Sequence, residues 1–93
     1  MTLAELQTYV GCPNVRSTYY LAHRNGLDVT AWEARVAGRK GWWVAVTIPC
    51  GDHEIVAQVA WVSGGVKSRD EEVLYLVGRV LAKQANPDPS EVH

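Results

Sequence analysis

The stretch that decides the fold is LAHRNGLDVTAWEARVAG, residues 21–38. Two interpretations compete for it. As helices, it supplies the packing residues, the tight turn and the second N-cap of a DNA-binding helix-turn-helix at Leu21, Ala22, Gly26 and Asp28. As a strand, it alternates so that one face carries Thr30, Trp32, Ala34 and Val36. The choice between these interpretations depends on the segments that follow.

The next segment, GWWVAVTIPCGDHEIVAQVAWV (residues 41–62), predicts a β-hairpin. Gly51-Asp52 is typical of a two-residue hairpin turn. Pairing outward from this turn sets Cys50 opposite His53 and Trp42 opposite Trp61. Eight of the ten side chains on the shared face are then apolar, namely Trp42, Val44, Val46, Ile48, Ile55, Ala57, Val59 and Trp61. A slip of one residue would divide this set between the two faces.

The same test favours a strand for the opening stretch. With Gly38, Arg39 and Lys40 as a loop, Val36 opposes Trp42 and the apolar face continues. The helical interpretation has a capping box at Thr30 and Glu33, but its helix would end after about seven residues. It would also place Arg35 where such a helix normally buries an apolar side chain.

Helices are predicted at both ends of the chain. Thr2 and Glu5 form a capping box for a helix over 3–10, and residues 14–25 favour a helix slightly over a strand. Residues 68–84 form the long helix, with a second capping box at Ser68 and Glu71. We therefore expect an α+β domain over residues 1–85, with strands at 30–36, 42–49 and 54–62 forming a three-stranded antiparallel meander. The long helix packs on one face, and residues 86–93 form a flexible tail.

Composition narrows the function without naming it. The formal net charge is −1, whereas dedicated nucleic-acid binders usually carry a basic excess. No apolar run reaches the ~20 residues that a membrane span requires, and the opening segment does not resemble a signal peptide. We expect a cytoplasmic protein that does not bind membranes, and nucleic acid as a partner is not favoured.

Residues 29–85 resemble the sheet-plus-helix domain of the HicB antitoxin family. The likeness rests on a Trp-rich strand ending in proline and on acidic residues at the start of the following helix, at Trp42, Trp43, Val44, Pro49, Glu71 and Glu72. The resemblance implies a protein that blocks an RNA-cleaving toxin by direct contact. The chain departs from the family by placing its extra 28 residues at the N-terminus and by lacking a clear DNA-binding segment after the sheet.

Neither a metal site nor a catalytic centre is predicted. Cys50 and His53 flank the hairpin turn, and Cys12 and His23 lie elsewhere, so a zinc site would need distant segments to converge. A hairpin tip is convex and gives a Cys–His pair no pocket. We expect no cofactor and no enzymatic activity.

The face of the sheet away from the long helix contains Trp43 and is too apolar for a purely solvated surface. Either the N-terminal helices cover it or it binds a partner, since aromatic residues anchor interfaces. The predicted partner-binding residues are Trp43, Glu33, Arg35, Val56, Gln58, Arg39 and Lys40. We expect a small non-enzymatic protein that occupies or inhibits a protein partner, antitoxin-like or of the kind carried by phages and mobile elements, and that could form a homodimer. The alternative is a helix-turn-helix regulator using residues 18–39.

Overall fold

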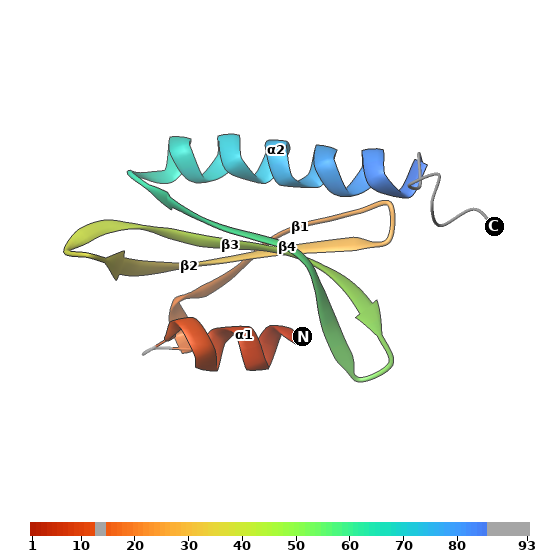
Figure 1. The fold of residues 1–93 in the computed structure, drawn as a ribbon, viewed down its shortest axis with the longest axis horizontal. Coiled ribbons are helices and arrows are strands. Elements are labelled where there is room, and N and C mark those ends of the chain that lie inside the picture. Colours follow the sequence, from red (N-terminus) through yellow and green to blue (C-terminus); the bar gives the residue numbers. More distant parts are fainter. Residues whose placement is uncertain (13–14, 86–93) are drawn as a thin grey trace.

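A computed structural model describes residues 1–12 and 15–85 of the chain, apart from the side chains of residues 15 and 24. A four-stranded antiparallel sheet in the order β1-β2-β3-β4 lies between two helices, with α2 along one face and α1 against the other (Figure 1). The elements are α1 Leu3–Val10, a 3₁₀ turn Val15–Ser17, β1 Thr18–Arg24, β2 Leu27–Val36, β3 Arg39–Cys50, β4 His53–Ser63 and α2 Val66–Ala85. The predicted α+β class is confirmed, but the sheet has four strands rather than three. The predicted tail lies outside the described residues.

Helix α1 forms where its capping box predicts it. The Thr2 side chain accepts a hydrogen bond from the Glu5 amide, and the Glu5 carboxylate accepts one from the Thr2 amide. Gly11 then ends the helix with a positive φ of 90°. The N-terminus is tied to the sheet because the Val56 amide donates to the Met1 carbonyl. Leu6 is the buried residue of the helix.

The opening stretch is a β-hairpin, so both helical interpretations of this region are wrong. Residues 18–24 form strand β1 rather than the end of a helix, and residues 18–39 contain no helix-turn-helix. Asn25 and Gly26 make the turn with φ of 54° and 78°, the left-handed values of a tight hairpin turn. Asn25 and Gly26 therefore act as a hairpin turn that makes the flanking residues strands, and they do not end a helix.

The second hairpin turns earlier than predicted. Ala37 and Gly38, at φ of 52° and 77°, make a two-residue turn, and Val36 pairs with Arg39. The predicted three-residue loop at 38–40 is therefore wrong. The pairing of Val36 with Trp42 would have set Trp32 opposite Val46, whereas Trp32 pairs with Trp43. Because side chains alternate along a strand, this odd shift moves Trp32 to the opposite face from Trp42.

The predicted register of the third hairpin is confirmed next to its turn but is wrong farther along the strands. Cys50 pairs with His53 and Ile48 with Ile55, as predicted. A bulge then shifts the register between Val46 and Thr47, so that Trp61 pairs with Trp43 and Trp42 pairs with Val62. The predicted pairing of Trp42 with Trp61 is wrong because one extra residue in β4 reverses the facing of everything beyond it.

The sheet consequently has two separate apolar clusters. Beneath α2, the buried members are Leu27, Val29, Ala31, Trp42, Val44, Val46, Leu76 and Val80. Beneath α1, the buried members are Leu6, Trp32 and Ala45, with Leu3, Val10, Cys12, Trp43, Val56 and Val59 packed against them. Ile48 and Ile55, which the regular register placed in the core, are 38% and 36% exposed.

Helix α2 begins at Val66, before the predicted capping box, so Ser68 lies inside the helix instead of capping it. The helix packs chiefly on β3 and β4. Within the described residues, no helix is long and apolar enough to cross a membrane.

Candidate functional site

An apolar groove lies between α2 and the β1–β2 half of the sheet. Its floor consists of Leu21 and Ala22 from β1 and Leu27 and Val29 from β2. The groove exists because α2 lies over β3 and β4, while strands are spaced about 4.8 Å apart and one helix is too narrow to cover four of them. It encloses about 410 Å³.

Helix α2 provides the wall of the groove. Val73, Leu74 and Val77 face it, and the Leu74 side chain is 67% exposed. This leucine lies outside the stripe that packs on the sheet, where Leu76 and Val80 are buried. The helix therefore presents apolar side chains on two sides, and only one of them is covered by the protein's own sheet.

One end of the groove is polar and held in place by stacking. The Arg69 guanidinium lies over the Trp42 ring, 4.7 Å from its centroid, and its Nε donates to the Asp70 carboxylate at 3.0 Å. Tyr19 lies against the same ring with centroids 5.6 Å apart. These contacts orient the only charged side chains that line the groove, among the residues described there.

A second constellation lies on the opposite face of the sheet. The Asp28 carboxylate on β2 is 2.6 Å from His23 Nδ1 and accepts a hydrogen bond from the Tyr20 hydroxyl at 3.4 Å. The hydrogen bond with His23 lowers the pKa of Asp28, and its contact with Glu54 lowers it further. Burial, followed by the hydrogen bond with Asp28 and its negative charge, raises the pKa of Glu54. The two carboxyl groups thus shift each other's pKa in opposite directions, with the proton favoured on Glu54 over Asp28.

Burial raises the pKa of Tyr20 as well, with the Asp28 charge as a further cause. The cluster therefore links β1, β2 and β4 through side chains. In the described part of the chain, no group of three or more His, Cys, Asp or Glu side chains could hold a metal ion. Cys12 contacts Thr18 Oγ1 at 3.5 Å, whereas Cys50 is exposed at the last hairpin, so the residues weighed for zinc do not converge.

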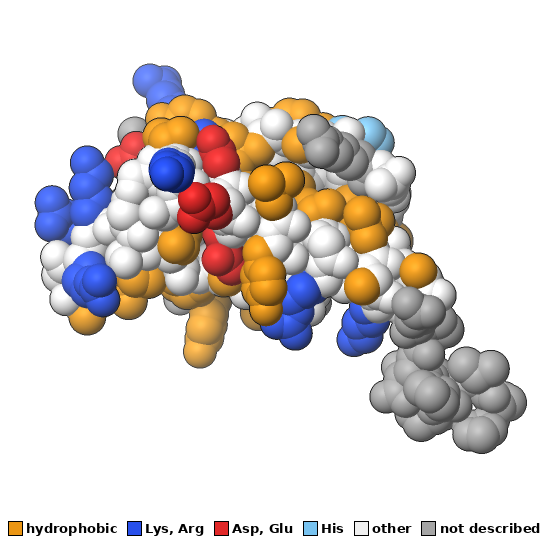
Figure 2. Space-filling model, turned by 90° about the horizontal axis from the view of Figure 1, so that it is seen from above, with side chains coloured by type: hydrophobic (Ala, Val, Ile, Leu, Met, Phe, Trp, Pro, Cys, Tyr) orange, Lys and Arg blue, Asp and Glu red, His pale blue; other side chains and the backbone are white. Residues whose placement is uncertain are grey.

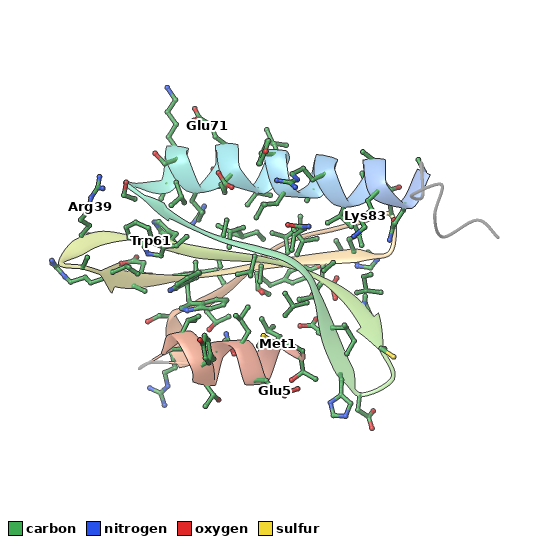
Figure 3. The ribbon with its side chains drawn as sticks, in the orientation of Figure 1. Met1, Glu5, Arg39, Trp61, Glu71 and Lys83 are labelled. Atoms are coloured by element: carbon green, nitrogen blue, oxygen red, sulfur yellow. The ribbon has the colours of Figure 1, made fainter. Side chains whose placement is uncertain are left out.

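The predicted partner-binding residues are divided among four places. Trp43 and Val56 lie partly buried in the cluster beneath α1. Glu33 and Lys40 line a shallow depression with Trp42 and residues 64–66 at the start of α2. Arg35 and Arg39 lie at the tip of the β2–β3 hairpin, where Arg35 donates to the Gly38 carbonyl and Arg39 to Ser63 Oγ (Figure 3). Gln58 lies opposite Val46, beside the bulge.

Sequence reasoning missed the groove. Leu74 and Tyr75 fall outside the apolar stripe of the long helix. Two consecutive apolar residues on the outer side of a helix indicate an exposed apolar surface, and the sequence alone shows them. The floor of the groove could not be predicted in the same way, because Leu21 and Ala22 belong to β1 and this segment was not predicted to be a strand. Comparisons with family models, with curated proteins and with solved structures found no match to this chain.

Proposed function

We propose that this chain is a small, non-enzymatic binding protein that acts by occupying a partner protein, and that the groove between α2 and the β1–β2 half of the sheet is its binding surface. The observation that carries the proposal is the apolar lining of this groove, with half-buried Leu21 and Ala22 on its floor and the exposed Leu74 at its rim. Exposed apolar surface of this kind is costly in a monomer and marks interaction sites.

The chemistry of the groove supports binding rather than catalysis. Its lining is apolar except for Arg69 and Asp70, which pair with each other. A groove of this form suits an apolar helix or peptide segment of a partner, and the stacked Arg69 supplies a polar edge that sets its direction. The small size, the nearly neutral charge and the resemblance to HicB antitoxins fit an inhibitor of a cytoplasmic partner, antitoxin-like or carried by a phage or mobile element.

Substitution of Leu74 by aspartate tests the proposal. The side chain is exposed, so Leu74→Asp leaves folding nearly unchanged but puts a charge at the rim of the groove. A matched control is Tyr9→Asp, because Tyr9 is 84% exposed on α1, across the sheet from the groove. We expect tagged wild-type protein to capture one partner in stoichiometric amount from nuclease-treated lysate of its source.

The partner should bind purified Tyr9→Asp with unchanged affinity and Leu74→Asp at least about tenfold more weakly, measured by calorimetry with both proteins pure. Equal binding by the two variants would exclude the groove as the surface. Capture of nucleic acid alone would contradict a protein-binding function.

A further inference from the structure

The two edges of the sheet differ in how the rest of the chain covers them. The edge of β4 is paired with the N-terminus, because Thr2 forms a bridge to Ile55 and the Val56 amide donates to the Met1 carbonyl. Strand β1, at the other edge, pairs with β2 alone, and no described residue makes a backbone hydrogen bond to its outer side. Alternate residues of an edge strand point their N–H and C=O groups outward. The outer side of β1 is therefore a row of backbone donors and acceptors that the described chain leaves unpaired.

Strand β1 also lacks the side chains that usually keep an edge strand from pairing with another chain. Lysine and proline are common protections of such strands. This strand contains neither, and its single arginine, Arg24, is its last residue. Tyr19 and Tyr20 on it are 45% and 60% exposed. At the bulge between Tyr20 and Ala22, the neighbours Leu21 and Ala22 both line the groove, so the unpaired edge and the groove are adjacent.

The groove has a wall on one side only. Val73 and Leu74 of α2 belong to this wall, and Leu21 and Ala22 form the floor toward the open side. Figure 2, which views the molecule from the α2 side, shows hydrophobic side chains exposed beside this helix. A strand added to β1 would lie about 4.8 Å beyond it, with alternate side chains on the α2 face of the sheet. These side chains would form the second wall of the groove.

A helix in the same groove would cover the apolar floor but would leave the β1 edge unpaired. The backbone groups of a helix are bonded to each other, whereas those of an extended segment are free to pair with a neighbouring strand. An extended segment therefore uses both features of this surface, the unpaired edge and the apolar lining.

The opposite face of β1 determines which charge such a segment carries. Tyr20 lies on this face, and its hydroxyl donates to Asp28. Asp28 is also bonded to His23 and is in contact with Glu54, so this cluster has two carboxyl groups for one imidazole. Arginine or lysine on an added strand would meet the ring of Tyr20 and the negative charge beside it. A complementary segment thus alternates apolar residues, on the α2 side, with basic residues on the other side.

We propose that the partner binds as an extended segment of this alternating chemistry, which adds a fifth strand to the free edge of β1. The inference rests on the proposed function in taking the groove as the binding surface, and it specifies how the partner occupies that groove. Backbone hydrogen bonds to β1 supply affinity, and the groove selects the apolar side chains.

A synthetic peptide tests the proposal without the natural partner. The probe is a capped peptide of about eight residues, an ordinary strand length, that alternates valine with arginine. One control peptide has glutamate in place of arginine, and the other separates the same valines and arginines into two blocks. Fluorescence anisotropy at physiological salt should show that the alternating peptide binds at least about tenfold more tightly than either control. Equal binding of the alternating and block peptides would mean attraction by charge alone and would overturn the inference.

Hydrogen exchange of the wild type locates the bound peptide, and two variants check the position. Exchange of alternate amides within residues 18–24 should slow by at least about tenfold, and exchange in β4 should not change. Ala22→Lys puts a charge in the groove beside the edge, as natural edge strands often do, and should abolish binding. Ile55→Lys adds the same charge at the exposed Ile55 on the other edge, and it should bind the peptide like the wild type. The exchange result decides the question even if Ala22→Lys does not fold.

The outcomes separate this inference from the proposed function. An alternating peptide that does not bind up to millimolar concentration, or that protects amides only outside β1, would overturn the inference. A natural partner that still requires Leu74 would in that case leave the proposed function intact, with the partner bound as a helix. A natural partner indifferent to Leu74→Asp would contradict the proposed function, whatever the peptide does.

Discussion

Gly41 shows how much of the packing depends on one missing side chain. It lies on β3 opposite Ser63, and a Cβ built there would meet the carbonyl oxygen of Val62 and would lie 2.8 Å from the Trp61 ring. The tryptophan therefore occupies the space that any other residue at position 41 would need. Glycine at this place is a packing requirement, since its backbone is not in the left-handed region.

Replacing Gly41 by alanine should destabilise the domain by about 1–3 kcal/mol, because backbone and indole must both move. Gly78→Ala is the matched control, because open space surrounds Gly78 and alanine favours a helix. Thermal melts should therefore show a lower Tm for Gly41→Ala and an equal or higher Tm for Gly78→Ala. Equal Tm values for Gly41→Ala and the wild type would mean that Trp61 does not pack on Gly41.

At the scale of elements, two hairpin turns share one backbone conformation but differ in how well their residues suit it. The β1–β2 and β2–β3 turns have nearly the same backbone, with first-position φ of 54° at Asn25 and 52° at Ala37. Asparagine tolerates this left-handed conformation, whereas in alanine it brings the Cβ too close to the following carbonyl oxygen and is unfavourable. The second turn is therefore held by the strands it connects rather than by its own residues.

Ala37→Asn should stabilise the protein by about 0.5–1 kcal/mol, since it converts this turn to the Asn-Gly pair already used at Asn25. The reverse change, Asn25→Ala, should destabilise by a similar amount. Chemical denaturation of both variants gives the two free energies of unfolding. A loss of stability in Ala37→Asn would show that the turn does not adopt the φ values described for it.

Three tryptophans also link neighbouring strands of the sheet. Trp32, Trp43 and Trp61 are neighbours across β2, β3 and β4, and the first two belong to the cluster beneath α1. Their indole N–H groups are buried without a hydrogen-bond partner among the residues described. This row consequently stabilises the sheet through buried apolar area, and a slip of the β2–β3 or the β3–β4 register would separate one of its two cross-strand pairs.

At the scale of the whole molecule, Asp28 and Glu54 make stability depend on pH in opposite directions. The pKa of Asp28 is lowered, so its contribution is present above its unfolded pKa and is lost as pH falls through the folded value. The pKa of Glu54 is raised above its ordinary 4.5, so its contribution is present in acid and is lost as pH rises through the folded value.

Glu54→Gln should therefore raise the Tm at about pH 7 by a few degrees, because the amide keeps a donor toward Asp28 without the second negative charge. The gain should vanish below about pH 4, where Glu54 is protonated. Asp28→Asn should lower the Tm at pH 7, and this difference should shrink as the pH falls. A gain from Glu54→Gln that is the same at both pH values would show that the two carboxyl groups do not interact.

Local signals in the sequence determined which kinds of element this protein has. The capping box at Thr2 and Glu5, the Gly51-Asp52 turn and the alternation in residues 30–36, 42–49 and 54–62 each act over a few residues, and all of them are present in the fold. Strand β1 escaped detection because its alternation is short and its bulge near Leu21 interrupts it.

Only the tertiary structure decided which face of each strand is buried and where α2 lies. A side-chain period of two means that any odd shift of register, three residues at the Ala37-Gly38 turn or one residue at the bulge of β4, reverses the facing of the strand beyond it. Both registers satisfy the same alternating pattern, and the choice between them depends on contacts such as Trp61 over Gly41 that join residues far apart in the chain. The groove follows from the same cause, since its floor and wall meet only after α2 has packed on β3 and β4.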